Sequence, residues 1–311
     1  MKYVAGVDVG GTNIKLGMVD EEGMVLCRDN IPAKTRESFQ EFAEPIAQSL
    51  TDLQAQVGGR LKAIGIGTPG FTNKQTGILL EAAELVPYLK GNSLAQFLGE
   101  KLRVEAFADN DGTCAAAGEW KWGSGKAYRN FLLITLGTGI GGGLVLDGKL
   151  YRGSQGFAGE VGHLCVDPNG SWCVCGSRGC LEQYASATAI LRLYREKRQK
   201  RGLVGQQAMS PKAVFDAAGA GDPLAVETLR EGARAIAQIF GSATNLLNLD
   251  ACILGGGLSL AGDQLAELVR PQVVDYAWPL LAQNLQIRTA ELKNDAGLLG
   301  AAALAFEELQ R

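Results

Sequence analysis

Short apolar runs that end in glycine recur along the chain. The valine-rich run Tyr3–Val9 stops at Gly10-Gly11, and a second apolar run, Ile14–Val19, follows at once. Apolar runs of this length between glycines are typical of buried β-strands, and the glycine pair predicts a tight turn. The same pattern of strand, turn and strand returns near the middle of the chain, in Phe131–Leu136, Gly137–Gly143 and Leu144–Leu146.

Two later runs extend the repeat. Ala63–Gly70 and Ala251–Gly257 are each a short apolar run that enters a glycine turn, and helical sequence precedes them in Arg36–Val57 and Asp222–Asn245. Strands that alternate with helices predict an α/β fold. Because the whole order occurs twice, we expect two α/β lobes related by duplication, each presenting a glycine-rich turn to a shared cleft. Chance recurrence of glycine-flanked strands is the alternative.

Composition narrows the class of protein. Of 311 residues, 46% are hydrophobic and 20% charged, the balance of a globular protein, and the length suggests two lobes. The net charge of −3 argues against a nucleic-acid binder with a basic surface. No apolar run reaches the roughly 18–20 residues of a membrane span, and the N-terminus lacks the apolar segment of a signal peptide. We therefore expect a cytoplasmic protein with no membrane or nucleic-acid partner.

The glycine turns carry groups that suit phosphate. Asp8, Gly10, Gly11 and Thr12 place a carboxylate, bare backbone N–H groups and a hydroxyl at the end of one predicted strand. Backbone N–H groups and a hydroxyl can donate to phosphate oxygens, and the carboxylate could position a metal ion beside them. The stretch 137–143, with Thr138, offers the same groups. A purely structural hairpin is the alternative for either turn alone.

A compact set of cysteines follows the only histidine. Cys173, Cys175 and Cys180 lie within eight residues, and His163 stands ten residues before the first of them. Three thiolates and one imidazole complete a tetrahedral zinc site and leave no position open for water, so we predict structural zinc. A redox thiol set is the alternative. Cys165 is a possible substitute ligand, although its apolar neighbours favour a buried position, and the three remaining cysteines are expected in the core.

Three polar residues in a row join a predicted strand to an alanine-rich helix. Asp109, Asn110 and Asp111 follow the apolar stretch Val104–Ala108. The carboxyl end of a strand is where α/β proteins place substrate contacts. Helix capping by Asp or Asn is the alternative, although capping needs only one such residue. Glu160 and Glu182 flank the cysteine set, and zinc binding would orient both carboxylates.

Taken together, these motifs resemble the ROK family of sugar kinases, within the actin-like ATPase superfamily, over essentially the whole chain. The resemblance rests on six segments: Asp8–Thr12, Asn110-Asp111, Leu136–Gly143, Glu160–His163, Cys173–Glu182 and Gly255–Gly257. It implies a two-lobed actin-like ATPase fold, a duplicated ribonuclease H-like α/β fold, with an inserted zinc-binding loop. The predicted small lobe comprises residues 1–110 and 295–311, and the large lobe residues 111–294.

The resemblance also implies roles for single residues. Asp111 matches the general base that accepts a proton from the sugar hydroxyl, and His163 matches both a sugar ligand and a zinc ligand. The implied sugar-binding residues are Thr68, Pro69, Gly70, Asn110, Asp111, Glu160, His163 and Glu182. The implied ATP-binding and phosphate-binding residues are Asp8, Gly10, Gly11, Thr12, Asn13, Lys15, Thr138, Gly139, Gly256 and Gly257. The family often has lysine where Asn13 stands, so a lysine contact to phosphate from that position is in doubt here.

The implied reaction is ATP-dependent phosphorylation of a hexose, with Mg²⁺ accompanying ATP and zinc as a structural ion. Glucose, giving glucose 6-phosphate, is the first expectation. Kinases of N-acetylglucosamine or N-acetylmannosamine are the alternative, and polyphosphate is an alternative donor. A non-catalytic sugar sensor or repressor belongs to another functional class, but Asp8 lies too near Met1 to leave room for an N-terminal DNA-binding domain. The expected partners are the sugar, ATP and a second copy in a homodimer.

Overall fold

The computed structural model describes residues 2–33, 38–81, 86–203, 210–258 and 263–310 and divides the chain into two compact units. The first unit contains residues 1–126, 150–159 and 294–311, and the second contains residues 127–149 and 160–293. None of the helices in the described ranges combines the length and the apolar character that a membrane span requires.

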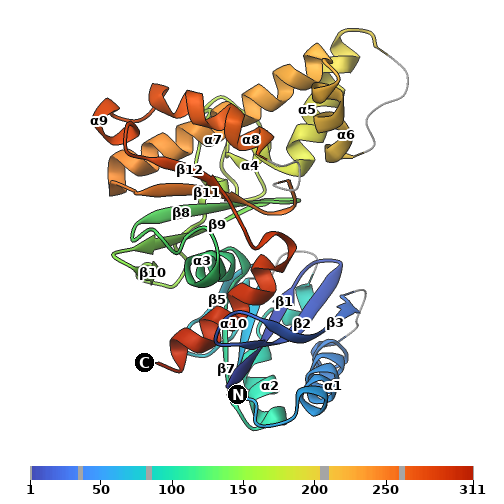
Figure 1. The fold of residues 1–311 in the computed structure, drawn as a ribbon. Helices are drawn as coiled ribbons and strands as arrows, with labels where there is room; N and C mark the ends of the chain where they lie inside the picture. The colour runs from blue at the N-terminus through green and yellow to red at the C-terminus, as the bar shows by residue number, and fades with distance from the viewer. Residues whose placement is uncertain (1, 34–37, 82–85, 204–209, 259–262, 311) are drawn as a thin grey trace. The chain divides into compact units, whose positions relative to one another are not determined.

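The first unit is built around a five-stranded sheet in the order β3-β2-β1-β4-β7 (Figure 1). Its strands are β1 (Tyr3–Val9), β2 (Asn13–Asp20), β3 (Val25–Pro32), β4 (Ala63–Thr68) and β7 (Glu105–Asn110), with the small pair β5 (Phe71–Thr72) and β6 (Leu79–Glu81) beside them. Its helices are α1 (Phe39–Val57), the 3₁₀ turn η1 (Pro87–Leu89), α2 (Leu94–Leu102), α3 (Asp111–Trp122) and α10 (Ala296–Glu308).

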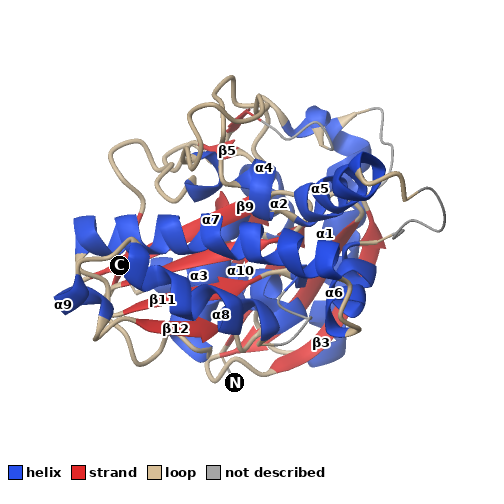
Figure 2. Ribbon diagram, turned by 90° about the horizontal axis from the view of Figure 1, so that it is seen from above, coloured by secondary structure: helices blue, strands red, loops and turns tan. Residues whose placement is uncertain are grey.

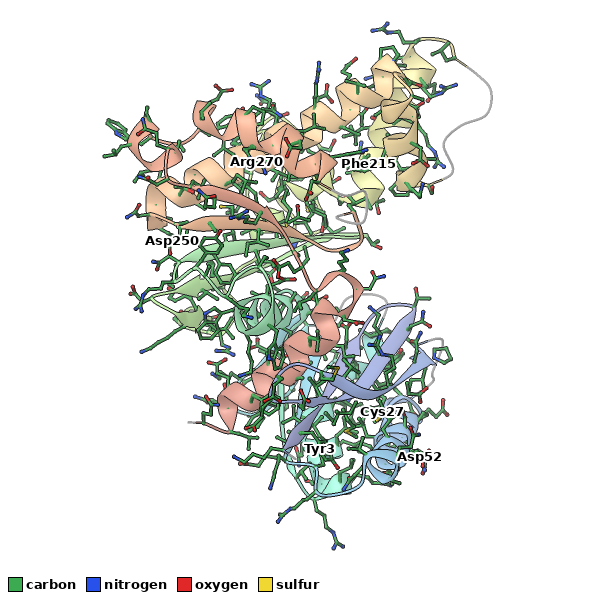
Figure 3. All side chains as sticks on the ribbon, in the orientation of Figure 1. Tyr3, Cys27, Asp52, Phe215, Asp250 and Arg270 are labelled. Carbon is green, nitrogen blue, oxygen red and sulfur yellow. The ribbon has the colours of Figure 1, made fainter. Side chains whose placement is uncertain are left out.

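Both faces of this sheet are covered by helices, as the apolar pattern of β1 requires. Alternate residues of a strand point to opposite faces. Tyr3, Ala5 and Val7 join one apolar core with side chains of α1 and α2, whereas α10 packs along β1 and β4 on the other face. Tyr3 and Cys27 are labelled in Figure 3, and the Tyr3 hydroxyl donates to the carbonyl of Gly58 at 2.9 Å, just after α1 ends.

The second unit repeats the plan with the order β10-β9-β8-β11-β12. Its strands are β8 (Phe131–Leu136), β9 (Ile140–Leu146), β10 (Lys149–Tyr151, which ends in the first unit), β11 (Ala251–Gly255) and β12 (Gln286–Thr289). Its helices are η2 (Val161–His163), α4 (Glu182–Ala185), α5 (Ala187–Lys200), α6 (Pro211–Gly219), α7 (Pro223–Leu247), α8 (Gln264–Val269), η4 (Arg270–Asp275) and α9 (Pro279–Ala282), with η5 (Lys293–Asp295) at the boundary.

One long helix dominates this unit. The side chain of Asp222 accepts the backbone N–H groups of Leu224 and Ala225 at 2.8 and 3.2 Å, and Pro223 occupies the first turn, so α7 begins where the sequence predicted. The buried stripe of α7 forms one core with β8, β11 and α6. Figure 2 shows α7 alongside β11, and Phe215 of α6, which belongs to this core, is labelled in Figure 3. Asp250, just before β11, accepts the backbone N–H groups of Arg129 and Asn130, just before β8.

The two sheets arrange their strands in corresponding orders, which confirms the predicted duplication. In each unit a strand pairs antiparallel with the next strand along the chain and parallel with a strand that follows a helix, as β1 does with β2 and β4, and β8 with β9 and β11. The limits of the units differ from the boundaries drawn at residues 110 and 294. α3 packs along α10, where the rings of Trp122 and Phe306 meet edge to face, and therefore stays in the first unit.

Candidate functional site

The first unit gathers its predicted site residues at the carboxyl edge of its sheet. Asp8 on β1 lies opposite Gly67 on β4, and Thr68, the last residue of β4, lies opposite Asn110, the last residue of β7. The Asn110 side-chain amide donates to the carbonyl of Gly70 at 3.3 Å, which joins the Thr68–Gly70 turn to the start of α3. The structure thus brings Thr68, Pro69, Gly70, Asn110 and Asp111 together.

The polar residues at the end of β7 and the start of α3 make different contacts. Asn110 caps α3, because its Oδ1 accepts the backbone N–H groups of Gly112 and Thr113 at 2.9 and 3.3 Å. Asp111 is the first residue of the helix, and its Oδ1 accepts the N–H of Gly112 at 2.8 Å. Capping therefore accounts for Asn110, whereas Asp111 is the candidate base at the helix N-terminus, where a carboxylate is favoured.

The first glycine turn is a tight hairpin. The N–H of Gly10 donates to the carbonyl of Asn13 at 3.1 Å, and Gly11 and Thr12 form the bend between β1 and β2. Asp8 and Lys15 are a cross-strand pair whose charged groups lie 3.8 Å apart, and the Lys15 ammonium also donates to the carbonyl of Asn294 at 2.7 Å. Burial raises the pKa of the Asp8 carboxyl, and nearby Lys15 partly offsets that rise.

The second glycine turn is shorter than the sequence predicted. The stretch 137–143 was interpreted as a loop, but Gly141, Gly142 and Gly143 continue strand β9 and pair with Thr135, Ile134 and Leu133 on β8. Glycine is depleted in strands, so a sequence pattern cannot distinguish this extended segment from a loop. The turn itself is Gly137–Gly139, closed by a hydrogen bond from the N–H of Gly137 to the carbonyl of Gly139.

Glu182 holds this turn in place. Its Oε2 accepts the backbone N–H of Ile140 at 2.9 Å, and a Cβ at Gly139 would lie only 2.5 Å from the same oxygen. A side chain at Gly139 would therefore have to displace this carboxylate. The hydroxyl of Thr188 donates to the carbonyl of Thr138 at 2.9 Å, a contact that no sequence motif indicated. The segment that follows the cysteines thus supports the candidate phosphate turn.

The predicted zinc ligands converge. The ligand atoms of His163, Cys173, Cys175 and Cys180 all lie within 4.8 Å of one another. The Cys173 sulfur lies 3.5 Å from the Nδ1 of His163, and the sulfurs of Cys175 and Cys180 are 3.6 Å apart. A tetrahedral zinc ion with ligands at about 2.0–2.3 Å requires ligand separations of about 3.3–3.8 Å. The four groups therefore fit zinc in donor type and number, and these two pairs also fit it in spacing.

Cys165 is not part of this set. We expected a buried residue, but Cys165 is exposed, so that expectation was wrong. Its segment forms an isolated β-bridge opposite Cys180, and its side chain lies outside the apolar core. Cys114 and Cys252 are buried as expected, and Cys27 is half-buried.

Two candidate sugar ligands adjoin the cysteine set. The Nε2 of His163 lies 4.0 Å from a carboxylate oxygen of Glu160, on the opposite side of the ring from the Nδ1 that faces Cys173. Burial raises the pKa of Glu160, His163 lowers it, and Glu182 raises it further. The second unit thus brings together Glu160, His163 and Glu182 with Thr138 and Gly139.

The last glycine pair follows β11. Gly256 has a φ of +85°, and a Cβ there would lie 2.5 Å from the backbone of Leu136 at the end of β8. Gly257 comes next and is exposed. This turn therefore approaches the end of β8, where the Gly137–Gly139 turn begins.

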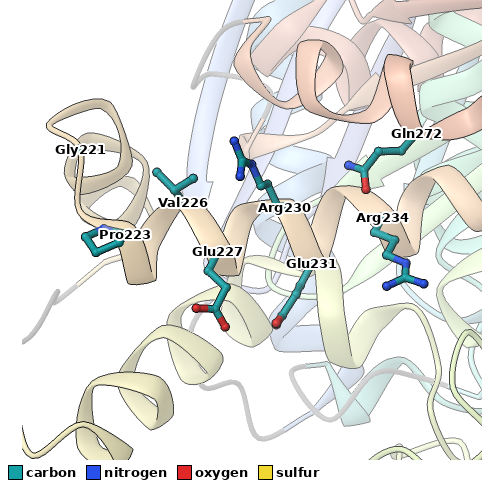
Figure 4. A pocket seen from close by; sticks show the side chains of 8 residues that line it. All are labelled: Gly221, Pro223, Val226, Glu227, Arg230, Glu231, Arg234 and Gln272. Carbon is teal, nitrogen blue, oxygen red and sulfur yellow. The ribbon is translucent and has the colours of Figure 1, made fainter.

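A pocket on α7 is lined by other residues. Figure 4 shows Arg230 and Arg234 one helical turn apart, with Gln272 of η4 beside them. Arg234 donates to the hydroxyl of Tyr276 at 2.8 Å. None of the predicted sugar, phosphate or metal ligands lines this pocket.

A contact that the sequence analysis missed lies beside the candidate base. The Nε of Arg152 donates to the Oδ2 of Asp109 at 2.6 Å, and both side chains are almost completely buried. The two residues are 43 positions apart, and no spacing rule connects them.

Comparison with known proteins matches the model of the ROK family over residues 4–308. The glucokinase of Thermotoga maritima is 35% identical, and the alignment covers 98% of this chain and 97% of the relative. An N-acetylmannosamine kinase of Yersinia pestis is 33% identical over 97% of this chain and 98% of its own. The crystal structure of a ROK glucokinase from Streptomyces griseus in complex with glucose and AMPPNP has a TM-score of 0.81 at 31% identity, covering 98% of this chain and 99% of that one. With the fold, the Cys/His cluster and the glycine turns in place, these matches show that the chain belongs to the ROK family.

Proposed function

We propose that the protein transfers the γ-phosphoryl group of ATP to a hexose, with glucose as the preferred acceptor and glucose 6-phosphate as the product. The observation that carries this proposal is the full-length similarity to glucokinases together with Asn110 and Asp111 at the end of β7. Sugar kinase activity is common to the relatives described above, whereas the choice of glucose is the finer part of the proposal.

In the proposed reaction, Asp111 accepts the proton of the sugar hydroxyl as its oxygen attacks the γ-phosphorus. The bond between that phosphorus and the bridging oxygen breaks, and ADP leaves with the electron pair. A hydroxyl is a weak nucleophile until a base accepts its proton, so the carboxylate must lie within hydrogen-bond reach of it. Asn110, the Thr68–Gly70 turn, Glu160, His163 and Glu182 bind the other sugar groups in this proposal.

Phosphoryl transfer depends mainly on positioning and on neutralising charge. We assign the phosphate groups of ATP to the two hairpin turns, through the backbone N–H groups and hydroxyls of Gly10–Asn13 and of Thr138 and Gly139. Asp8 and Lys15 lie at the base of the first turn. Gly256 and Gly257 are assigned to the adenosine. Mg²⁺ bound with ATP would offset the negative charge of the phosphates.

We assign zinc to His163, Cys173, Cys175 and Cys180. Four protein ligands leave no site for water, so zinc would act as a structural ion. His163 would then be held with its Nε2 turned away from the cysteines and Glu182 fixed two residues after Cys180. The cluster would in this way orient the sugar ligands of the second unit.

N-acetylmannosamine is the second candidate acceptor. The observation that favours it is the 33% identity to an N-acetylmannosamine kinase, only slightly below the value for the glucokinase. N-acetylglucosamine is a further candidate acceptor, because both N-acetyl sugars differ from glucose in the substituent at C2.

We also propose that the protein is cytoplasmic, has no nucleic-acid or membrane partner and forms a homodimer. Light scattering of the purified protein tests the homodimer.

The decisive experiment measures ADP formation with Mg·ATP across glucose, N-acetylglucosamine, N-acetylmannosamine, mannose and fructose, and repeats it with polyphosphate as donor. We expect the highest kcat/KM with glucose and ATP. Asp111→Asn should keep the fold and the zinc but lose roughly 10²- to 10⁴-fold in kcat. An Asp111→Asn variant with a near-normal kcat would remove Asp111 from the role of base.

A further inference from the structure

Arg152 is a buried cation that joins three segments of the first unit. Its side chain is only 7% exposed. The Nε contacts Asp109 at the end of β7 at 2.6 Å, and an Nη2 contacts Glu307 on α10 at 3.4 Å and lies 4.0 Å from Glu308. Lys74 pairs with Glu308 at 3.2 Å on the outer side of this group. A planar guanidinium can serve two carboxylates at once, which the single ammonium of lysine cannot do in the same geometry.

Both oxygens of Asp109 are used. The Oδ2 accepts from Arg152, and the Oδ1 accepts the backbone N–H of Asn110 at 2.9 Å. Arg152 therefore fixes the side chain that holds the last peptide group of β7. Asn110 then caps α3 and contacts Gly70, and Asp111 opens the helix.

The position of Asp111 consequently depends on a chain of short contacts that starts at Arg152. Without a positive partner, the buried Asp109 carboxylate would be left unpaired, and a buried unpaired charge is strongly unfavourable. It would turn towards water. This change alters the hydrogen bond to the N–H of Asn110 and frees the turn that carries the proposed base and its neighbouring sugar ligand.

We propose that Arg152 is a positioning residue: through its ion pair with Asp109 it sets the place of Asn110 and Asp111 relative to the sugar. The inference rests on the proposed function, because it assigns a purpose to the ion pair within that reaction. Arg152 and Asp109 contact neither of the proposed phosphate turns in any hydrogen bond or ion pair of the described residues. Their loss should therefore affect the sugar and leave ATP binding unchanged.

The test compares steady-state kinetics of the wild-type protein, Arg152→Lys, Asp109→Asn and the double variant Asp109→Asn/Arg152→Gln. We expect each variant to raise the KM for the sugar and lower kcat, by roughly 10- to 100-fold in kcat/KM for the sugar, because small displacements of reacting groups have effects of this size. The KM for ATP should stay within about twofold. General destabilisation would lower the active fraction, and hence kcat, without changing the KM for the sugar.

The double variant keeps the test valid if a single variant does not fold, because it removes both charges of the Asp109–Arg152 pair and leaves neither buried without the other. Glu307 loses its contact with Arg152, whereas Glu308 keeps Lys74. Since the two residues act as one unit, its loss should be no larger than that of the more severe single variant. Arg270→Lys is the matched control, because Arg270 forms an exposed ion pair with Glu267 in the second unit and should give wild-type kinetics.

The outcomes separate this inference from the proposed function. A wild-type protein that is silent towards every sugar contradicts the proposed function and removes the reaction that Arg152 would serve. An active wild-type protein whose folded Arg152→Lys and double variants keep the normal KM for the sugar overturns the inference alone. Equal increases in the KM values for sugar and ATP also overturn it, because they show an effect that is not confined to the sugar ligands.

Discussion

Glu182 acts at two places in the second unit. It follows the proposed zinc ligand Cys180 by two residues, and it accepts the N–H that follows the Gly137–Gly139 turn. A residue assigned to the sugar is thus in direct contact with the backbone assigned to phosphate. Displacement of the Glu182 carboxylate would also displace the backbone of the Gly137–Gly139 turn. In our proposal, this one side chain therefore couples the sugar and ATP sites.

We expect Gly139→Ala to disturb this contact, because its Cβ would lie 2.5 Å from the Glu182 carboxylate and must displace it. The expected result is a decrease of roughly 10- to 100-fold in kcat/KM for the sugar and for ATP alike. Steady-state kinetics with each substrate varied in turn would measure it.

Substitutions at two other glycines serve as controls for this result. Gly137→Ala in the same turn should have a smaller effect, because the nearest atom to its Cβ would be 3.9 Å away. Gly219→Ala at the end of α6, where the space is open, should give wild-type kinetics. Equal values for Gly139→Ala and Gly219→Ala would show that the Glu182 contact is unimportant.

At the scale of single elements, α7 depends on its N-terminal cap. Besides the two backbone N–H groups of the first turn, Asp222 accepts the hydroxyl of Tyr194 on α5 at 2.7 Å, and Arg198 lies 3.8 Å away. Burial tends to raise the pKa of Asp222, but these hydrogen bonds and the arginine outweigh it, and the pKa lies below its usual value. The ionised carboxylate therefore stabilises the folded protein.

Asp222→Ala should lower the free energy of unfolding at pH 7 by about 1 kcal/mol, whereas Asp222→Asn keeps the capping oxygen and should cost less. The pKa of Asp222 is lower in the folded protein than the unfolded value of about 3.9. Its ionic contribution is therefore complete above that unfolded value and disappears as the pH falls through the folded value.

Urea unfolding monitored at pH 7 and in steps below pH 4 measures both effects. The difference in midpoint between wild type and Asp222→Asn should shrink as the pH falls, as far as the protein remains folded. A difference that is constant with pH would show that the charge of Asp222 contributes nothing.

Most elements could be predicted from local sequence. The strands β1, β4, β8 and β11 and the start of α7 agree with the expected positions because apolar periodicity and capping are local signals. β9 was missed in part because three consecutive glycines look like a loop, and only pairing with β8 makes them a strand.

The candidate site, too, could be predicted from the sequence only in part. Sequence spacing was sufficient to predict that His163 and three cysteines meet, because the four lie within a short segment. The Arg152–Asp109 ion pair could not be predicted from the sequence, because the fold brings together residues from separate parts of the chain. The roles of Asp111, Glu160 and Glu182 remain predictions until the variants are measured.

At the scale of the whole molecule, the proposed zinc site gives the clearest test. Purified protein should contain about one zinc ion per chain, measured by mass spectrometry of the metal. Removing it with a chelator should lower the midpoint of thermal unfolding by several degrees and abolish most activity, because metal binding stabilises the folded loop. Added zinc should restore both.

Cysteine variants identify the ligands. Cys175→Ser should lose zinc, whereas Cys165→Ser should keep it, because Cys165 lies outside the cluster. Retention of zinc by Cys175→Ser together with loss by Cys165→Ser would contradict the assigned set. A protein that folds and works fully without metal would show that the four residues do not form a structural zinc site.

The path of the chain has a consequence for how the protein can be divided. The chain passes from one unit to the other after residues 126, 149, 159 and 293, so neither unit is a continuous stretch of sequence. A single cut by a protease, wherever it falls, leaves at least one fragment that contains parts of both units. Neither half of the duplication can therefore be expressed intact as a simple truncation.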